Sequence, residues 1–185
     1  MSALERNTAA ARAALFVDGG NTFGSSKAMG WLIDSKKLFD FCGKLAEKDG
    51  YQVELSYYFT AYDPIDPGQL GFLDALGHIG YTVISKPIKT TAAQGGIRYG
   101  SKGNLDVELA LKVMEKERFF SLALIVSGDS DFEPIINHLH ATGHLVYILS
   151  ADAVLSRELR NAGDKIVLLN EHRSELERVV KTKAP

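Results

Sequence analysis

The stretch "ALIVSGDSDFEPII", Ala123–Ile136, decides the fold that we expect for this chain. Its residues are apolar or small up to Val126, the segment Ser127–Asp131 then introduces two acids, and an apolar pattern resumes after it. A short apolar run bounded by turn residues is typical of a buried strand. The sequence therefore predicts a strand at Leu122–Val126, a helix at Phe132–Ala141, and two carboxylates where the strand ends.

The same alternation of apolar and amphipathic segments extends along the chain in both directions. Apolar, β-branched strands between helices indicate an α/β fold with a mostly parallel central sheet that is covered on both faces. The other strands are expected at Ala13–Val17, Val53–Ala61, Tyr81–Ser85, His144–Leu149 and Ile166–Leu169. The other helices are expected at Ser35–Lys48, Pro67–His78, Asn104–Lys116, Ala153–Asn161 and Glu171–Val180.

Length and composition restrict the class of protein. The 185 residues predict one domain, 1–185, with a core at about 13–169 and a closing helix at 171–180. A net charge of −2 supplies no global basic field, which argues against a protein that coats DNA but permits a local basic patch. The only cysteine, Cys42, excludes a disulfide framework and a thiolate zinc cluster. Neither an export signal nor a membrane-spanning run is recognisable, so we expect a soluble, cytoplasmic protein.

Two expected connections, 21–34 and 87–103, are longer than connections usually are, and long loops are often functional. Residues 86–102, which include most of the second connection, contain four cations and no acid. This segment therefore predicts a local positive arm on a slightly negative protein. A solvated mobile loop explains the same composition equally well. The cations are Lys86, Lys89, Arg98 and Lys102.

Three acids are expected to converge at one edge of the sheet. Asp18 follows the first strand directly, and Asp129 and Asp131 follow the strand at Leu122–Val126. Ligands of open α/β sheets bind beyond the carboxyl ends of the strands, at the point where the strand order reverses. If the sheet has the common order 3-2-1-4-5, these two strands are neighbours at that point and the three carboxylates meet.

A fourth acid lies on an expected helix. In "GNLDVELALKVMEK", Gly103–Lys116, the position of Asp106 continues the spacing of an apolar stripe, so this carboxylate should face inward at the start of the helix. An acid on a buried stripe breaks a local rule, and such violations tend to mark sites. Glu108 and Lys112 are expected to form an exposed i, i+4 pair. The stripe consists of Leu109, Ala110, Val113 and Met114.

Each of these acids also has a purely structural explanation. Asp131 could cap the helix that follows it, and Asp129 could hold an Asx turn. Asp18 could form a turn, and Asp106 could complement the helix dipole. Local turn chemistry does not require all four acids to share one end of one sheet, which favours a common site.

Electrostatics restricts what four neighbouring carboxylates can do. Two carboxylates about 4 Å apart repel each other by roughly 4 kcal/mol at an effective dielectric constant of about 20, so four of them need protons or a cation. A set of oxygen donors without thiolates suits Mg²⁺ or Mn²⁺. Ser127, which lies between the strand and the paired acids, is expected to orient Asp129 or a metal-bound water. Beside a basic arm, such a site favours hydrolysis of phosphodiesters.

The segment "GGNTFGSSK", Gly19–Lys27, does not fit other phosphate-binding motifs. Ser25 stands where a phosphate-binding loop requires its lysine, and Asn21 stands where a dinucleotide-binding loop requires its second glycine. A small-molecule phosphatase of the haloacid-dehalogenase type would need an acid at Gly20, so this hypothesis is disfavoured.

Three motifs, in order along the chain, resemble those of a known family. They are "FVDGGNTF" (Phe16–Phe23), "KGNLDVELALKV" (Lys102–Val113) and "IVSGDSDFEPII" (Ile125–Ile136). They are similar to the core motifs of NYN domains, in particular the LabA-like branch, which belongs to the wider PIN-like nuclease group. The resemblance, which extends from Ala13 to Leu169, implies a Rossmann-like (PIN-like) three-layer α/β/α sandwich and a metal-dependent ribonuclease site.

The resemblance also assigns roles to residues. Asp18 matches the acid after the first strand, Asn21 its accompanying asparagine, and Asp106 the helix acid. Asp129 and Asp131 match the paired acids after the fourth strand. These five residues would be catalytic, with the four aspartates as ligands of Mg²⁺ or Mn²⁺ and with Asn21 positioning Asp18 or the scissile phosphate.

Two hypotheses of function stay open at this point. The first is a metal-dependent ribonuclease in which Lys89, Arg98 and Lys102 hold the backbone of single-stranded RNA. The second is a non-catalytic regulator that binds RNA or a nucleotide through the same acidic pocket. RNA is thus the expected partner, and homodimerisation is a further expectation.

Overall fold

A parallel sheet forms the centre of the molecule. The computed structural model describes residues 11–92, 98–101 and 105–179. Six strands lie in the order β3-β2-β1-β6-β7-β8, and each neighbouring pair runs parallel, which confirms the expected sheet. The strands are β1 (Ala11–Asp18), β2 (Tyr51–Tyr62), β3 (Thr82–Pro87), β6 (Leu122–Val126), β7 (Leu145–Ser150) and β8 (Lys165–Leu168).

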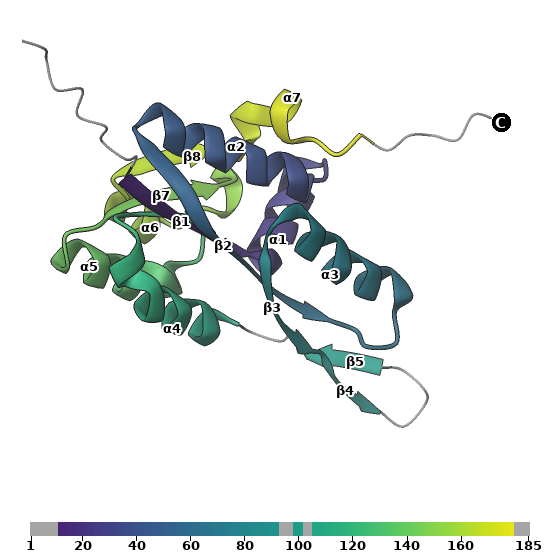
Figure 1. Ribbon diagram of the computed structural model, residues 1–185. Helices are drawn as coiled ribbons and strands as arrows, with labels where there is room; N and C mark the ends of the chain where they lie inside the picture. The colour runs from purple at the N-terminus through teal and green to yellow at the C-terminus, as the bar shows by residue number, and fades with distance from the viewer. Residues whose placement is uncertain (1–10, 93–97, 102–104, 180–185) are drawn as a thin grey trace, which may run out of the picture.

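Helices cover both faces of this sheet, as Figure 1 shows, so the three-layer sandwich is also confirmed. Side chains alternate across β1, where Leu15 packs into the core on one face and Phe16 into the core on the other. The first core receives α2 (Ser35–Lys48), α3 (Pro67–Ile79) and α7 (Arg173–Leu176). The second core receives α4 (Asp106–Lys116), α5 (Glu133–Ala141) and α6 (Arg157–Ala162).

The strand order places the carboxyl ends of β1 and β6 side by side. Val17 lies opposite Val126 in the last pair of the register, so Asp18 and the turn after β6 emerge at the same edge of the sheet. All five residues of β6 are buried, because helices cover both of its faces. The reversal of strand order therefore lies where the sequence predicts it, between the first strand and the strand at Leu122–Val126.

A helix occupies most of the segment 21–34, for which the sequence predicts a loop. This helix, α1 (Gly19–Met29), buries small polar residues instead of an apolar stripe. The Ser26 hydroxyl, for example, donates to the Thr22 carbonyl at 3.1 Å and accepts from the Ile33 amide at 3.1 Å. The loop prediction is wrong because it relied on apolar periodicity, which α1 does not have.

The closing helix is shorter than the sequence predicts. A 3₁₀ turn, η4 (Leu169–His172), leads into α7, which ends at Leu176, and Glu177 forms an antiparallel bridge with Ile33. The Asp34 amide also donates to the Leu176 carbonyl at 2.9 Å. These backbone contacts replace further helical turns, so the prediction of a helix beyond Leu176 is wrong as far as the described residues extend. No helix in the described part of the chain is long and apolar enough to cross a bilayer.

The second long connection contains a separate two-stranded sheet, so the loop prediction is wrong there too. β4 (Lys89–Ala92) and β5 (Arg98–Ser101) pair antiparallel, with Lys89 opposite Ser101 and Ala92 opposite Arg98. Figure 1 shows this β4–β5 hairpin projecting from the end of β3. The hairpin thus lies in the chain between the carboxyl end of β3 and the first turn of α4.

Candidate metal centre

Three carboxylates come together at the carboxyl edge of the sheet. Asp106, Asp129 and Asp131 each offer one oxygen, and these oxygens all lie within 4.8 Å of one another. Asp106 is the first residue of α4, whereas the other two lie in the turn after β6, at and within η2 (Ser130–Phe132). Asp106 and Asp129 are half-buried and Asp131 is exposed, so the cluster opens to solvent on one side.

Asp18 lies beside this cluster and is held by two donors. Its Oδ1 accepts from the Asn21 amide at 3.0 Å, which caps α1, and its Oδ2 accepts from the Ser127 hydroxyl at 3.0 Å. Burial raises the pKa of Asp18 above its usual value of 3.8 despite these hydrogen bonds, and the charges of Asp106 and Asp129 raise it further. Asp18 is therefore electrostatically part of the cluster, although it is not one of the three acids whose oxygens lie within 4.8 Å.

Two polar side chains connect α1 and β1 to the turn after β6. The Asn21 side-chain oxygen accepts from the Gly128 amide at 2.9 Å. The buried Ser127 hydroxyl, in addition to donating to Asp18, accepts from the Asp129 amide at 3.3 Å. Asn21 and Ser127 thus fix the backbone from which the acids project.

The capping carboxylate of this turn is Asp129. Its Oδ1 accepts from the Asp131 amide at 3.0 Å, which makes an Asx turn and caps η2. The Asx turn is the structural explanation that the sequence offered for Asp129, and it is confirmed. The alternative that Asp131 caps the following helix is wrong, because the chain first makes this 3₁₀ turn and α5 starts only at Glu133. The side chain of Asp131 is directed instead to the acidic cluster.

Glycine is required on both sides of the cluster because backbones approach closely there. A Cβ on Gly128 would lie 2.3 Å from the Val154 carbonyl oxygen, and a Cβ on Gly19 would lie 2.7 Å from the Phe59 carbonyl oxygen. Real Cβ atoms do not approach oxygens so closely. The sequence analysis did not identify either close approach, since the segments that the two glycines contact are distant from them in the chain.

Helix α4 presents Asp106 largely as expected, with two corrections. Leu109 and Val113 are buried, but Met114 is 49% exposed, so the buried stripe ends one residue early. The expected Glu108–Lys112 pair is wrong. Glu108 forms an ion pair with Lys86 at the end of β3, and Lys112 pairs with Glu115 at 2.5 Å. The Lys86–Glu108 pair links the base of the hairpin to the helix that carries Asp106.

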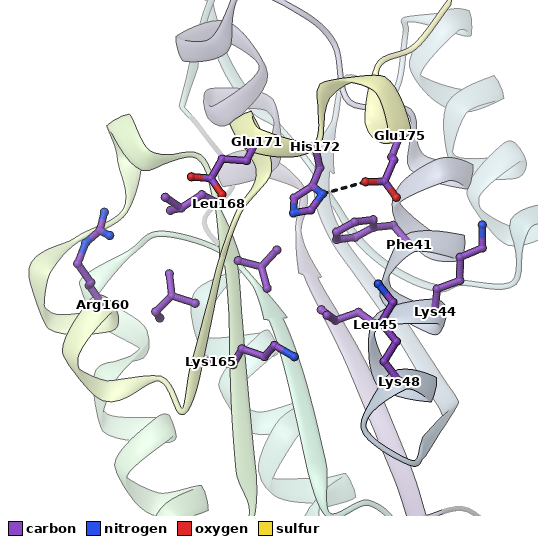
Figure 2. A pocket seen from close by; sticks show the side chains of 12 residues that line it. Phe41, Lys44, Leu45, Lys48, Arg160, Lys165, Leu168, Glu171, His172 and Glu175 are labelled. Atoms are coloured by element: carbon purple, nitrogen blue, oxygen red, sulfur yellow. Dashed lines mark hydrogen bonds and ion pairs between the residues drawn. The ribbon is translucent and has the colours of Figure 1, made fainter.

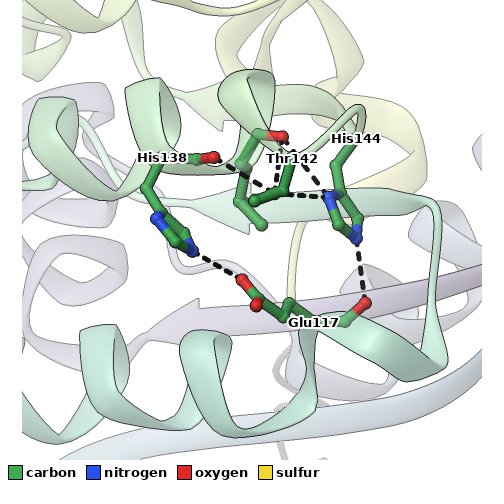
Figure 3. Close-up of polar contacts among 5 residues, drawn as sticks. Glu117, His138, Thr142 and His144 are labelled. Carbon is green, nitrogen blue, oxygen red and sulfur yellow. Dashed lines mark hydrogen bonds and ion pairs between the residues drawn. The ribbon is translucent and has the colours of Figure 1, made fainter.

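A polar network holds the far end of α4, as Figure 3 shows. Glu117, which begins the 3₁₀ helix η1 (Glu117–Phe119) after α4, contacts His138 Nε2 through its carboxylate at 2.6 Å. Its carbonyl oxygen lies 2.9 Å from His144 Nε2, and His144 Nδ1 lies 3.0 Å from the Thr142 hydroxyl. These histidines therefore have structural partners, and they anchor α4 at the end opposite Asp106.

The structure places only part of the expected RNA-binding arm. Lys89 is the first residue of β4 and Arg98 the first residue of β5, whereas Lys102 lies outside the described residues. The hairpin that carries Lys89 and Arg98 follows the carboxyl end of β3, which lies at the same edge of the parallel sheet as the acids.

A groove on another part of the surface contains none of the four acids. Figure 2 shows it between α2 and the edge strand β8, with Lys48, Lys165 and His172 among the side chains that line it. β7 separates β8 from β6, so this groove is not continuous with the carboxyl ends of β1 and β6. The acidic cluster is the better candidate for chemistry.

The donor set of the cluster fits a divalent cation. Its atoms are carboxylate oxygens, which Mg²⁺ and Mn²⁺ prefer, and the turn that carries two of them is held by the hydrogen bonds of Asn21 and Ser127. At a ligand distance of about 2.1 Å, two oxygens on opposite sides of Mg²⁺ are about 4.2 Å apart. Adjacent ligands would be about 3.0 Å apart. The three oxygens, which lie within 4.8 Å of one another, would therefore draw closer together around a bound ion.

Comparisons with known proteins agree with the motifs and the fold. Residues 12–170 match the NYN domain family. The chain is 34% identical over 169 residues to "Low amplitude and bright protein LabA" of Synechococcus elongatus, a match that covers 90% of this chain and 88% of that protein. The fold is similar to the crystal structure of a Vibrio parahaemolyticus protein of unknown function, with a TM-score of 0.75 and 19% identity over 94% of this chain and 99% of that chain.

Proposed function

Because the chain belongs to the NYN domain family, whose members are generally nucleases, we propose that it is a metal-dependent ribonuclease that hydrolyses RNA phosphodiester bonds. The observation that carries this proposal is the convergence of Asp106, Asp129 and Asp131 within 4.8 Å, with Asp18 beside them. Uncompensated carboxylates at these distances repel one another, so the arrangement favours a bound cation.

In this proposal the acidic residues hold Mg²⁺ or Mn²⁺ at the carboxyl edge of the sheet. Asp106, Asp129 and Asp131 supply the central ligands, and Asp18 completes the negative charge of the site. A divalent cation bound there would polarise the scissile phosphate and lower the pKa of a bound water.

The neighbouring polar residues position these acids. Ser127 and the Asn21 amide hold the Asp18 carboxylate in one orientation beside the cluster, where its charge would add to the attraction for the cation. Asn21 also fixes the Gly128 amide and with it the turn that carries Asp129.

The β4–β5 hairpin would hold the substrate. Lys89, Arg98 and Lys102 would contact the phosphates of single-stranded RNA, so binding should weaken as the salt concentration rises. The position of the hairpin between β3 and α4 supports this assignment, because the RNA backbone would then pass from the arm to the acids.

Cleavage of labelled single-stranded RNA tests the proposal. We expect the wild-type protein to cleave in Mn²⁺ or Mg²⁺ and to be inactive in excess chelator. Asp129→Asn keeps an oxygen for the Asx turn but removes the charge, and it should reduce the rate by about 100-fold or more, since even the residues behind metal ligands contribute 10- to 100-fold. Asp74→Asn, an exposed acid on α3, is the matched control and should cleave like the wild type.

Two outcomes would contradict the ribonuclease. The first is equal cleavage by the wild type and Asp129→Asn, which would show that a contaminant or another site does the chemistry. The second is tight binding of RNA without turnover in any of the divalent metals supplied. That result would favour the alternative, a non-catalytic RNA- or nucleotide-binding regulator that uses the same acidic pocket.

A further inference from the structure

The solvent-facing side of α1 has a composition that the metal site does not explain. Gly20, Phe23, Gly24 and Lys27 have the spacing i, i+3, i+4, i+7 and therefore share one face of the helix. This face begins directly beside Asp18, because a Cβ on Gly20 would lie 3.4 Å from the Asp18 Oδ1 atom.

Phe23 is a large aromatic side chain that the fold leaves in solvent. It is 56% exposed, and the Lys27 ammonium lies 4.4 Å from the centre of its ring. A cation over an aromatic ring is attracted to the ring face and holds the ring in one orientation. Lys27 therefore covers one face of the Phe23 ring, and a flat ligand would stack on the other face.

Two glycines leave the rest of this face uncovered. A Cβ on Gly24 would meet nothing within 4 Å, and Gly20 separates Phe23 from Asp18 without any side chain. With a rise of about 1.5 Å per residue, Phe23 lies only about 5 Å along the axis from Gly20, and Lys27 about 10 Å from it. An extended ligand can therefore pass from the acids along the backbone of α1 to the ring of Phe23.

The other exposed phenylalanines in the part of the chain that the structure describes do not share this position. Phe72 is 38% exposed and packs edge-on against Tyr58. Phe119 is 39% exposed and has the Arg118 guanidinium 4.8 Å from its ring centre, but it belongs to η1, after the end of α4 that lies opposite Asp106. Phe119 therefore resembles Phe23 in exposure and in its cation, and differs in its distance from the acids.

We propose that Phe23 is a platform on which a base of the RNA stacks next to the reacting phosphate, and that Lys27 contacts the phosphate on the far side of that base. This inference rests on the proposed function and specifies its substrate class. A stacking platform requires a base that is not already stacked and paired in a helix, so it selects single-stranded RNA over duplex. Stacking is tolerant of sequence, because every base has a flat face.

Binding measurements isolate this contact from catalysis. The probe is a fluorescein-labelled single-stranded RNA of mixed sequence. All proteins carry Asp129→Asn, so that they do not cleave the probe. The Kd is measured by fluorescence anisotropy in Mg²⁺. We expect Phe23→Ala and Phe23→Leu to weaken binding by between about 5-fold and 100-fold, since each removes the flat ring and Leu keeps most of the apolar bulk. Phe23→Trp should bind as well as the parent, and Lys27→Ala should bind more weakly with a smaller salt dependence.

Phe119→Ala is the matched control and should leave the Kd unchanged. Tryptophan fluorescence at position 23 reports direct contact with the RNA, which would not occur if Phe23 only supported the fold. Trp31, the native tryptophan, is buried and would contribute its own fluorescence, so it is replaced by Phe. When Phe23→Trp is added to this Trp31→Phe protein, single-stranded RNA should quench the new tryptophan's fluorescence and duplex RNA should not.

The outcomes separate this inference from the nuclease proposal. Unchanged binding by both Phe23→Ala and Phe23→Leu would overturn the platform, whether or not the wild type cleaves RNA, as would a parent protein that does not bind single-stranded RNA. Weakened binding with Trp quenching, in a wild type that never cleaves, would support the platform and overturn only the nuclease. Circular dichroism and the Tm of each variant show that the exposed substitutions leave the fold intact.

Discussion

Asp18 is the residue at which burial and charge conflict most directly. Its carboxylate lies beside Asp106 and Asp129, and burial raises its pKa even though Ser127 and the Asn21 amide donate to it. A carboxylate whose pKa is raised by folding destabilises the folded protein while it is charged. A cation in the cluster would remove this penalty, so the charge of Asp18 is consistent with a metal site.

Asp18→Asn should therefore stabilise the metal-free protein. Asparagine is as good a helix cap as aspartate and can still accept from the Asn21 amide, but it carries no charge. In excess chelator at pH 7, we expect the free energy of unfolding to rise, because the folded protein no longer holds a charged carboxylate in a half-buried position beside two other acids. Urea unfolding of both proteins measures the difference, and added Mn²⁺ should stabilise the wild type more than the variant.

The pH dependence has a definite sign. Because the folded-state pKa of Asp18 is above 3.8, the folded protein binds this proton more tightly than the unfolded chain. The destabilisation is therefore complete above the raised pKa and disappears as the pH falls from there towards 3.8. The advantage of Asp18→Asn should shrink over the same range. A variant that is less stable than the wild type at pH 7 without metal would contradict this account of Asp18.

At the scale of elements, α1 and the turn after β6 show where sequence patterns stop being informative. The acids at Asp18 and Asp129 could be located from the sequence, because strand ends and their acids are local features. Helix α1 could not, since its buried residues are glycine, serine and threonine and give no apolar period. The Asx turn of Asp129 was among the structural explanations that the sequence offered, but the 3₁₀ turn of η2, which separates Asp131 from the start of α5, was not predicted.

Two glycine substitutions distinguish a glycine that a neighbouring backbone approaches closely, Gly128, from one that lies in open space on a helix, Gly24. Gly128→Ala would place a methyl group 2.3 Å from the Val154 carbonyl oxygen, so we expect the free energy of unfolding to fall by about 1–3 kcal/mol and the acids to be displaced. Gly24→Ala, in open space on a helix, should raise it by up to about 1 kcal/mol. Urea unfolding measures both, and equal effects of the two substitutions would refute the packing described for Gly128.

At the scale of the whole molecule, the site exists because distant segments end at one edge of the sheet. The common strand order 3-2-1-4-5 made β1 and the strand at Leu122–Val126 neighbours in the expected sheet, and the structure confirms that they are. The hairpin at Lys89–Ser101 and the return of Glu177 to Ile33 were not predicted, since both depend on pairing between chain segments without a local signal. Long-range pairing therefore limited the prediction more than local chemistry did.

The Mn²⁺ dependence of the cleavage rate, compared between the wild type and Asp106→Asn, tests the central claim most directly. Asp106 reaches the cluster from α4, whereas Asp129 and Asp131 come from the turn after β6, so its role depends on the convergence itself. We predict that the wild-type rate on single-stranded RNA rises with Mn²⁺ to a plateau. Asp106→Asn should need a higher Mn²⁺ concentration, and its plateau rate should be lower than that of the wild type by about 100-fold or more. Identical curves for the two proteins would contradict a shared metal centre.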